Sequence, residues 1–217
     1  MKKQKQSKSI FLIVKRAFDL LLAVCVIIAM SPVLFLIAVI IKLTSSGPIL
    51  FKQKRIKQYK KDFYIFKFRT MYIDAPKDVP THLLNNPDKF ITPFGKFLRK
   101  TSLDELPQLF NILKGDMSFV GPRPALYNQY DLISLRERYG VNNIPVGLTG
   151  WAQINGRDEL SIEDKVSYDY YYLQHMSFKM DCLILFNTFF RVLSSKGVVE
   201  GGVKRGKKNV ENKDISI

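Results

Sequence analysis

The sequence predicts a mostly helical α+β protein: a long apolar helix near the N-terminus, then a small domain with one short β-hairpin and several amphipathic helices. Three observations support this. Residues 20–41 form an uncharged apolar run. Two β-prone segments follow at 49–55 and 63–72. Beyond them, helix-forming segments alternate with loops rich in glycine and proline.

Composition narrows the possible partners without choosing among them. The chain has 217 residues, 47% of them hydrophobic, which excludes global disorder. Its 34 Lys and Arg against 19 Asp and Glu give a net charge of +15, so we expect an anionic partner: nucleic acid, an acidic membrane or a phosphorylated substrate. Two cysteines and two histidines are too few for a disulfide framework or a zinc cluster.

The N-terminal part divides into a basic segment, residues 1–16, and a membrane segment, residues 17–43. The basic segment has no acidic residue. The apolar run at 20–41 is longer than the core of a signal peptide, so we expect it to be retained. As a straight helix it would extend roughly 33 Å, enough to cross a bilayer core.

A Ser31-Pro32 pair lies at the centre of this run. Proline removes the amide that would bond the carbonyl of Ile28, and the Ser31 hydroxyl can bond that carbonyl instead. Basic residues flank both ends of the run, which places both flanks in the cytoplasm by the positive-inside rule. A re-entrant hairpin satisfies both observations. Proline is also common in spanning helices, so the pattern leaves both topologies open.

Residues 44–200 are predicted to form a cytosolic domain. A hairpin turns near 58–62, and residues 74–93 form a proline-rich loop. Helices are expected at 94–100, 104–115, 162–178 and 180–197, the last of them apolar enough to lie at a membrane interface. Residues 201–217 lack apolar periodicity and are expected to be a disordered basic tail.

The segment TSLDELPQLFN, residues 101–111, permits two interpretations. Ser102 and Glu105 have the spacing of a capping box, with Asp104 in the positive end of a helix dipole, and spacing alone favours this structural role. Alternatively, Asp104 held ionised at the helix start can attack phosphorus while Glu105 binds a hard cation.

Basic residues follow at short intervals and are candidates for phosphate binding: Lys67, Arg69, Arg99 and Arg123. Most lysine and arginine side chains simply lie in solvent at the protein surface. Arg123 is the exception, because Pro122 and Pro124 stiffen the backbone around it and would present its guanidinium in a fixed geometry.

The order of these motifs resembles the bacterial sugar transferases known as monotopic phosphoglycosyl transferases. The resemblance extends from about Lys15 to Gly202. It rests on Lys15-Arg16-x-x-Asp19, Ser31-Pro32, KFRTM (67–71), TSLDELPQ (101–108), KGDMSFVGPRP (114–124), GLTGWAQINGRD (147–158) and the tyrosine-rich segment 168–172.

The resemblance implies a ping-pong reaction in which Asp104 attacks the β-phosphate of a UDP-sugar, releases UMP and passes the sugar phosphate to undecaprenyl phosphate. Mg²⁺ is the implied cofactor and Glu105 the matching acid. The implied phosphate-binding residues are Lys67, Arg69, Arg99 and Arg123, with Pro122, Arg123 and Pro124 as the nucleotide-binding loop. Asp181, and Asp169 within the tyrosine segment, are further candidates without an assigned role.

The resemblance also favours a re-entrant membrane helix broken at Ser31-Pro32, with the catalytic domain on the cytoplasmic face of the bacterial inner membrane. Inner-membrane lipid is then a partner and nucleic acid is not. The expected role is the first membrane step in assembling a capsule, exopolysaccharide or glycoprotein glycan, with an N-acetylated hexosamine as the sugar; the oligomeric state stays open.

The sequence differs from the family pattern at one motif, and there are three alternative functions. Pro145-Val146-Gly147 replaces the family's Arg-Pro-Gly, so an arginine is missing from the glycine-rich loop. The first alternative is an ordinary glycosyltransferase, which lacks support because no Asp-x-Asp motif or Rossmann glycine fingerprint occurs. The others are a basic protein that binds membrane or nucleic acid, and a non-catalytic scaffold at the membrane surface in glycan assembly.

Overall fold

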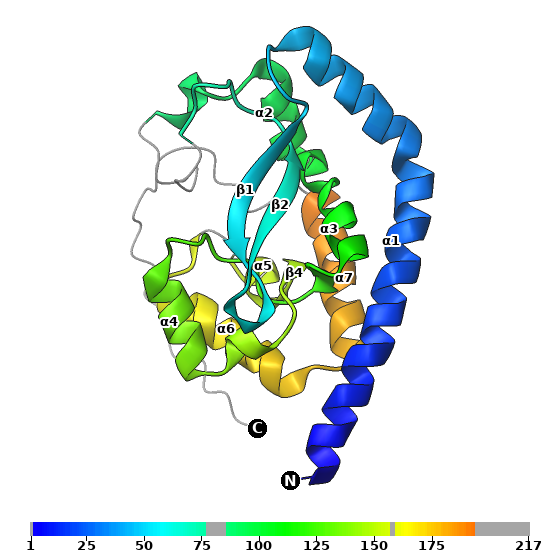
Figure 1. The fold of residues 1–217 in the computed structure, drawn as a ribbon, viewed down its shortest axis with the longest axis vertical. Coiled ribbons are helices and arrows are strands. Elements are labelled where there is room, and N and C mark those ends of the chain that lie inside the picture. The colour runs from blue at the N-terminus through cyan, green and yellow to red at the C-terminus, as the bar shows by residue number, and fades with distance from the viewer. Residues whose placement is uncertain (1, 77–85, 157–158, 194–217) are drawn as a thin grey trace.

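A computed structural model describes residues 2–76, 86–156 and 159–193. The long helix α1, Lys2–Thr44, lies along one side of a small domain built from short helices and strands (Figure 1). The predicted α+β, mostly helical fold is therefore confirmed. The expected disordered tail lies outside the described residues.

The predicted hairpin is present as strands β1, Leu50–Ile56, and β2, Asp62–Phe68. They pair antiparallel, from Leu50 opposite Phe68 to Ile56 opposite Asp62. The connection is a 3-10 turn, Gln58–Lys60, in which Tyr59 and Lys60 have positive φ. The other α-helices are α2 Pro93–Lys100, α3 Gln108–Lys114, α4 Tyr130–Arg138, α5 Trp151–Ile154, α6 Ile162–His175 and α7 Phe178–Leu193.

A second, parallel sheet joins β3, Ser118–Val120, to β4, Gly147–Thr149. Ser118 pairs with Gly147 and Val120 with Thr149. The sequence did not predict this sheet, because strands of three residues are too short to show an alternating pattern. Its position matters for function, since the Gly121–Pro124 loop leaves the end of β3.

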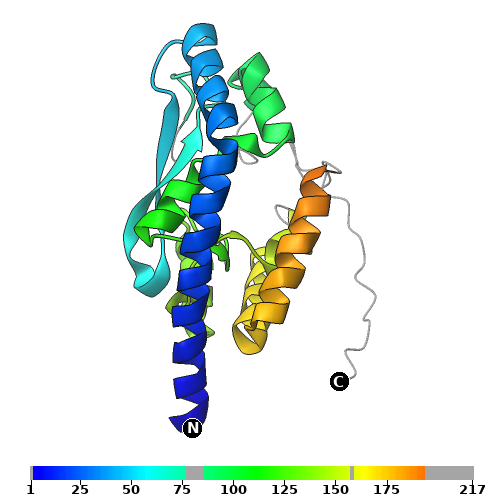
Figure 2. The same ribbon diagram turned by 90° about the vertical axis from the view of Figure 1, so that its right-hand side faces the viewer.

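The main core lies between the hairpin, the short parallel sheet and the helices behind them. Its buried members come from β2, α3, β3, α5, α6 and α7 and from the loops between them, and Ala23 brings α1 into the same cluster. Figure 2 shows α1 and α7 passing along the same face of the domain. The apolar N-terminal helix is thus partly a core element of the domain.

The N-terminal half of α1 is fixed to the domain by a buried ion pair at Lys15. Lys15 Nζ lies 2.5 Å from Asp181 Oδ2 on α7, and both side chains are almost fully buried. The hydroxyl of Tyr172 on α6 donates to the other oxygen of Asp181 at 2.7 Å. This cluster links three helices, and leaving either charge without its partner inside the protein would be strongly destabilising.

Two neighbouring residues on α1 add polar anchors. Arg16 donates to the carbonyls of Ile112 and Leu113, at 2.6 and 3.0 Å. It thereby provides hydrogen-bond donors for two carbonyl groups in the last turn of α3. Asp19 accepts the amide of Phe119 at 3.2 Å. These basic and acidic residues of the N-terminal flank therefore bind the domain itself.

The expected break at Ser31-Pro32 is not seen: α1 continues through Pro32 as one helix, and Figure 1 shows that it bends. The Ser31 hydroxyl donates to the carbonyl of Ile28 at 2.9 Å, as predicted. By length and composition, Ile10–Thr44 could cross a membrane, and it is the one helix of this kind among the described residues. The bend follows from the proline, which cannot supply the amide of the helical ladder.

Candidate functional site

The chain turns sharply between α2 and α3, and this turn presents two acidic side chains. Asp104 and Glu105 lie in a short 3-10 helix, Leu103–Glu105, that precedes α3. Ser102 has a φ of 56° and makes no side-chain capping bond, so the predicted capping box is wrong. Its carbonyl accepts the amide of Glu105 instead, at 3.2 Å. The Glu105 carboxylate is thereby available for other partners.

Glu105 is the meeting point of three separate elements. Its Oε1 atom lies 2.7 Å from Nζ of Lys67 on β2 and 2.9 Å from Nη2 of Arg123 in the loop after β3. One carboxylate oxygen thus binds two cations. A single acidic residue thus holds two of the four basic side chains that the sequence proposed for phosphate binding.

Asp104 lies beside this cluster and is itself buried. Its Oδ2 atom is 3.9 Å from Lys67 Nζ. Burial raises the pKa of the Asp104 carboxyl, while the positive charges of Lys67, Arg99 and Arg123 oppose that rise. The sequence placed Asp104 at the start of the following helix, but α3 begins only at Gln108.

Lys67 experiences the same burial with the opposite consequence. Removal from water lowers the pKa of its ammonium group, and the carboxylates of Glu105 and Asp104 oppose this change. Its Nζ atom lies 2.7 Å from Glu105 Oε1 and 3.9 Å from Asp104 Oδ2, between the two acids. Two carboxylates and the cations around them therefore form one electrostatically coupled unit.

A buried asparagine fixes the strand that supplies Lys67. Asn111 on α3 accepts the amide of Phe66 at 2.9 Å and donates to the carbonyl of Tyr64 at 2.8 Å. Both bonds run along the edge of β2, so the strand cannot slide past α3 without breaking them. Sequence reasoning missed Asn111, although an asparagine inside an apolar helix was an available signal.

The loop Gly121–Pro124 is held through its backbone. The Gly121 amide donates to the carbonyl of Thr149, and the Gly147 amide donates to the carbonyl of Pro122, both at 2.9 Å. A side chain at Gly121 would lie 2.3 Å from the carbonyl oxygen of Pro145. The segment Pro145-Val146-Gly147, in which the sequence resemblance indicated a missing arginine, thus supports the Gly121–Pro124 loop by close backbone packing.

Arg69 bonds to the junction between α1 and β1. Its guanidinium donates to the carbonyl and hydroxyl of Ser45, at 2.8 and 2.7 Å, where α1 meets β1. A side chain at Gly47 would lie 2.3 Å from Nη1 of Arg69, so that glycine makes room for it. Among the described residues, the site brings together Asp104, Glu105, Lys67, Arg99 and Arg123, and Arg69 anchors the junction.

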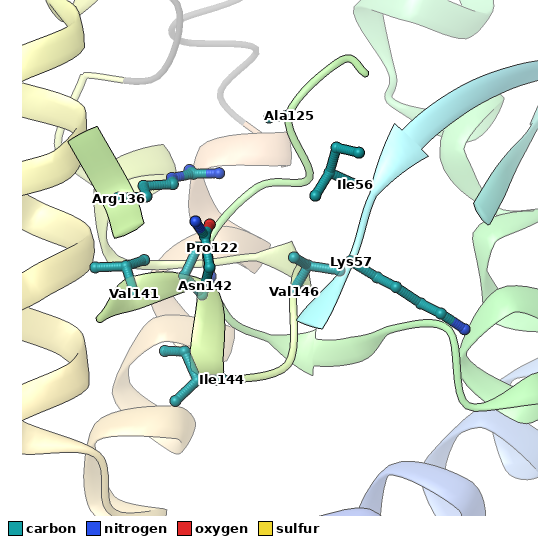
Figure 3. A pocket seen from close by; sticks show the side chains of 9 residues that line it. All are labelled: Ile56, Lys57, Pro122, Ala125, Arg136, Val141, Asn142, Ile144 and Val146. Atoms are coloured by element: carbon teal, nitrogen blue, oxygen red, sulfur yellow. The ribbon is translucent and has the colours of Figure 1, made fainter. Parts of the chain in front are cut away.

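The two further acidic candidates also bind other side chains of the protein. Asp181 pairs with Lys15, as described above. Asp169 on α6 pairs with Arg136 on α4, with Oδ2 2.6 Å from Nη2 and 3.0 Å from Nε. Arg136 lines a small pocket behind the Pro122 loop (Figure 3). No sequence motif had marked Arg136.

Two adjacent carboxylates surrounded by lysine and arginine define a class of site that handles phosphate-bearing ligands, because cations offset the charge of the incoming anion. Asp104 supplies a carboxylate oxygen as a possible nucleophile. The long apolar helix packed on the same domain is long enough to anchor that domain in a membrane.

Comparison with known proteins agrees with that class. The family model described as "Bacterial sugar transferase" matches residues 10–195. A Bacillus subtilis (strain 168) protein described as "Uncharacterized sugar transferase EpsL" is 40% identical over 188 residues, covering 86% of this chain and 91% of the relative. "Exopolysaccharide production protein ExoY" of Sinorhizobium fredii is 36% identical over 197 residues, covering 84% of this chain and 87% of the relative.

A longer relative has a more specific description. "UDP-glucose:undecaprenyl-phosphate glucose-1-phosphate transferase" of Escherichia coli (strain K12) is 41% identical over 191 residues. These cover 85% of this chain but only 41% of the relative. The chain belongs to the bacterial sugar transferase family, as its motifs predicted.

Proposed function

We propose that this protein transfers a sugar 1-phosphate from a UDP-sugar to undecaprenyl phosphate, with Asp104 as the covalent nucleophile and UMP as the first product. The observation that supports this most directly is the cluster in which Glu105 binds both Lys67 and Arg123 beside the buried Asp104. It combines a nucleophile with fixed positive charge in one place. The longer Escherichia coli relative is described as performing a reaction of this type.

In the first half-reaction, a carboxylate oxygen of Asp104 attacks the β-phosphorus of the UDP-sugar. A bond forms between that oxygen and phosphorus, and the bond from the β-phosphorus to the bridging oxygen breaks, so that UMP leaves with the electron pair. Lys67 and Arg123 lie where they can bind the phosphate oxygens that gain charge. Attack requires the ionised carboxylate, which these cations favour.

In the second half-reaction, a phosphate oxygen of undecaprenyl phosphate attacks the same phosphorus atom. The bond to Asp104 breaks and the free carboxylate returns. The product is a sugar linked to the lipid through a diphosphate, the form in which glycan assembly at a membrane would start. Membership of the family and the description of ExoY support a role in exopolysaccharide production.

Magnesium fits this site as a shared ion. Among the described residues, no group of three or more His, Cys, Asp or Glu could hold a metal alone. Mg²⁺ commonly binds one or two carboxylates together with substrate phosphates, so Glu105, with Asp104 beside it, supplies the donors that such an ion needs. When bound, the ion would neutralise developing phosphate charge.

The sugar is proposed to be an N-acetylated hexosamine, and a direct assay tests the whole reaction. Purified protein is incubated with Mg²⁺, undecaprenyl phosphate and, in turn, UDP-N-acetylglucosamine, UDP-N-acetylgalactosamine, UDP-galactose or UDP-glucose. We expect UMP release with an N-acetylated sugar. UMP release with UDP-glucose alone would show that the sugar is glucose and not an N-acetylated hexosamine. Release with none of them would contradict the proposed activity.

The membrane segment is proposed to be re-entrant, because both ends of the apolar run pack on the same domain. Ala23 is buried in the main core, and Ile37 and Ile41 pack against Phe68 and Leu98 near β2 and α2. About 13 residues, 24–36, lie between these anchors, and as a helix they extend roughly 20 Å. This is less than the roughly 30 Å hydrocarbon core, so a helix anchored to one domain at both ends does not cross it.

Apolar side chains on the outer surface support the same arrangement. Phe35 of α1 is 73% exposed, and four residues of α7 are between 48% and 62% exposed. Exposed aromatic and aliphatic groups of this density suit a lipid interface. The α7 residues are Leu183, Phe186, Phe189 and Phe190.

Cysteine labelling tests this topology. With the native Cys25 and Cys182 replaced by serine, Lys5→Cys and Lys61→Cys should both react with a membrane-impermeant maleimide only after the cytoplasmic side is opened. Labelling from opposite sides would contradict the re-entrant helix. Pro32→Leu restores the missing helical amide and should shift molecules toward the spanning form.

A further inference from the structure

The phosphate-binding loop receives a buried side-chain bond from a helix outside every recognised motif. Arg136, on α4, donates from Nη1 to the carbonyl oxygen of Arg123 at 2.9 Å. Its Nε and Nη2 atoms both donate to Oδ2 of Asp169 on α6. We infer that Arg136 is a positioning residue for the transfer reaction: oriented by Asp169, it fixes the backbone of Arg123 so that the Arg123 side chain meets Glu105 and the substrate phosphate.

The other bonds to this loop come from its remaining sides. The carbonyl of Pro124 accepts Nη1 of Arg55 at 3.0 Å, and the carbonyl of Ala125 accepts the amide of Ile56 at 3.0 Å. The carbonyl of Pro122 accepts the Gly147 amide. Arg136 supplies the bond at the central residue, the one whose side chain enters the site. Figure 3 shows Arg136 extending from α4 toward this segment.

The chemistry of the clamp explains why an arginine is present. Arg136 is 5% exposed and Asp169 1% exposed, so each charge needs the other inside the protein. The planar guanidinium donates in two directions at once, to a carboxylate and to a carbonyl at a fixed angle. Lysine would preserve the charge facing Asp169 but has no fork with which to hold both partners.

A chain of contacts thus runs from α6 to the carboxylates. Asp169 orients Arg136, Arg136 holds the Arg123 carbonyl, and the Arg123 guanidinium lies 2.9 Å from Glu105 Oε1. Small displacements of a phosphate-binding group are costly to a reaction that depends on positioning. Arg136 therefore acts on the reaction through Arg123 and not by touching the substrate.

A double-mutant cycle tests this route, and its activity arm rests on the proposed function. The variants are Arg136→Lys, Arg123→Lys and their combination, in the full chain, assayed well below their melting temperatures for UMP release with the UDP-sugar that the wild type uses. Arg136→Lys should slow release roughly tenfold in the wild-type background and by less than about twofold in the Arg123→Lys background, because the positioned group is already altered. Its loss of melting temperature should be the same in both backgrounds.

The matched control is Lys57→Gln. Lys57 lines the same pocket and pairs with Asp116 at 2.6 Å. The variant loses an ion pair, though a more exposed one than Arg136–Asp169, and removes no donor to the Arg123 carbonyl, so UMP release should stay within about twofold of wild type. Equal slowing by Arg136→Lys in both backgrounds would reduce Arg136 to a general stabilising residue and overturn the inference.

Hydrogen exchange tests the clamp without any turnover. In Arg136→Lys, the amides of Ile56 and Gly147, which bond to the loop carbonyls, should exchange several-fold faster than in wild type, while Lys57→Gln leaves the Gly147 amide unchanged. If these amides exchange at the wild-type rate in Arg136→Lys, the positioning role is overturned. This result does not depend on whether the protein turns over any UDP-sugar. Faster exchange together with an inactive wild type would contradict the proposed function and not the clamp.

Discussion

Asp104→Asn is expected to abolish covalent capture of the sugar phosphate. Incubating wild-type protein with its UDP-sugar and Mg²⁺, without undecaprenyl phosphate, should release UMP up to one equivalent of enzyme and add the mass of a phosphosugar to the peptide containing Asp104. The asparagine variant should show no adduct and a turnover lower by at least about 1,000-fold, because an amide is not a nucleophile toward phosphorus. Peptide mass spectrometry and a UMP assay measure both results.

The same variant should keep its fold. Burial raises the pKa of Asp104 above its usual value near 3.8, so the ionised carboxylate is held at a cost at neutral pH. A raised folded-state pKa means that this group favours folding below its unfolded pKa, and that this contribution is lost as pH rises through the folded value. Asp104→Asn should therefore melt at the same or a higher temperature than wild type at pH 7, and the difference should shrink toward pH 4.

Two results would contradict the assignment of Asp104. One is an adduct on a different peptide, and the other is full turnover by the asparagine variant. A third outcome would change the mechanism: if wild-type protein releases UMP only when undecaprenyl phosphate is present, transfer is direct and Asp104 acts as a base or metal ligand. Asp116→Asn is a suitable control, because Asp116 pairs with Lys57 and not with the carboxylate cluster.

Local patterns determined the parts of the fold that were predictable. The two strands of the hairpin are β-prone and alternate in part, and Ser161 caps α6, because its side chain accepts the Asp164 amide. Gly115 ends α3 with a φ of 83°, as expected for a left-handed cap. Each of these signals lies within a few residues of the structure it specifies.

The features that sequence reasoning missed depend on distant partners. Arg69 was grouped with the phosphate-binding candidates because basic residues recur there at short intervals, and the sequence did not show that its guanidinium would bond to Ser45 at the end of α1 while Lys67 bonds to Glu105. Arg136 has no motif, and its role appears only when α4 and α6 are packed together. Tertiary contacts of this kind have no local signature.

The membrane helix shows the same limit. The sequence identified Ser31-Pro32 and the basic flanks, but it gave no indication that Lys15 would be buried against Asp181. That contact reverses the usual interpretation of a basic residue before an apolar run, in which the charge remains in solvent. The anchoring of both ends of the run on one domain, and not the proline alone, is the stronger argument for a re-entrant helix.

Glu105→Gln is expected to weaken turnover by roughly 100-fold at limiting Mg²⁺ and to raise the Mg²⁺ concentration needed for half-maximal rate. A neutral amide is a poorer ligand for a hard cation than a carboxylate. The amide oxygen can still accept from Lys67 and Arg123, since both bind the same Oε1 atom at 2.7 and 2.9 Å. The substitution therefore removes charge while leaving the geometry of the cluster largely in place.

Titration of UMP release against Mg²⁺ separates this role from a structural one. Glu137→Gln is the matched control, because this substitution removes the same charge from the chain. Glu137 is a half-exposed acid on α4 that pairs with Lys60 at 3.1 Å. It should leave both the rate and the Mg²⁺ midpoint unchanged. If Glu105→Gln instead behaves like this control, Glu105 does not bind the ion, and its part in the site is limited to holding Lys67 and Arg123 in position beside Asp104.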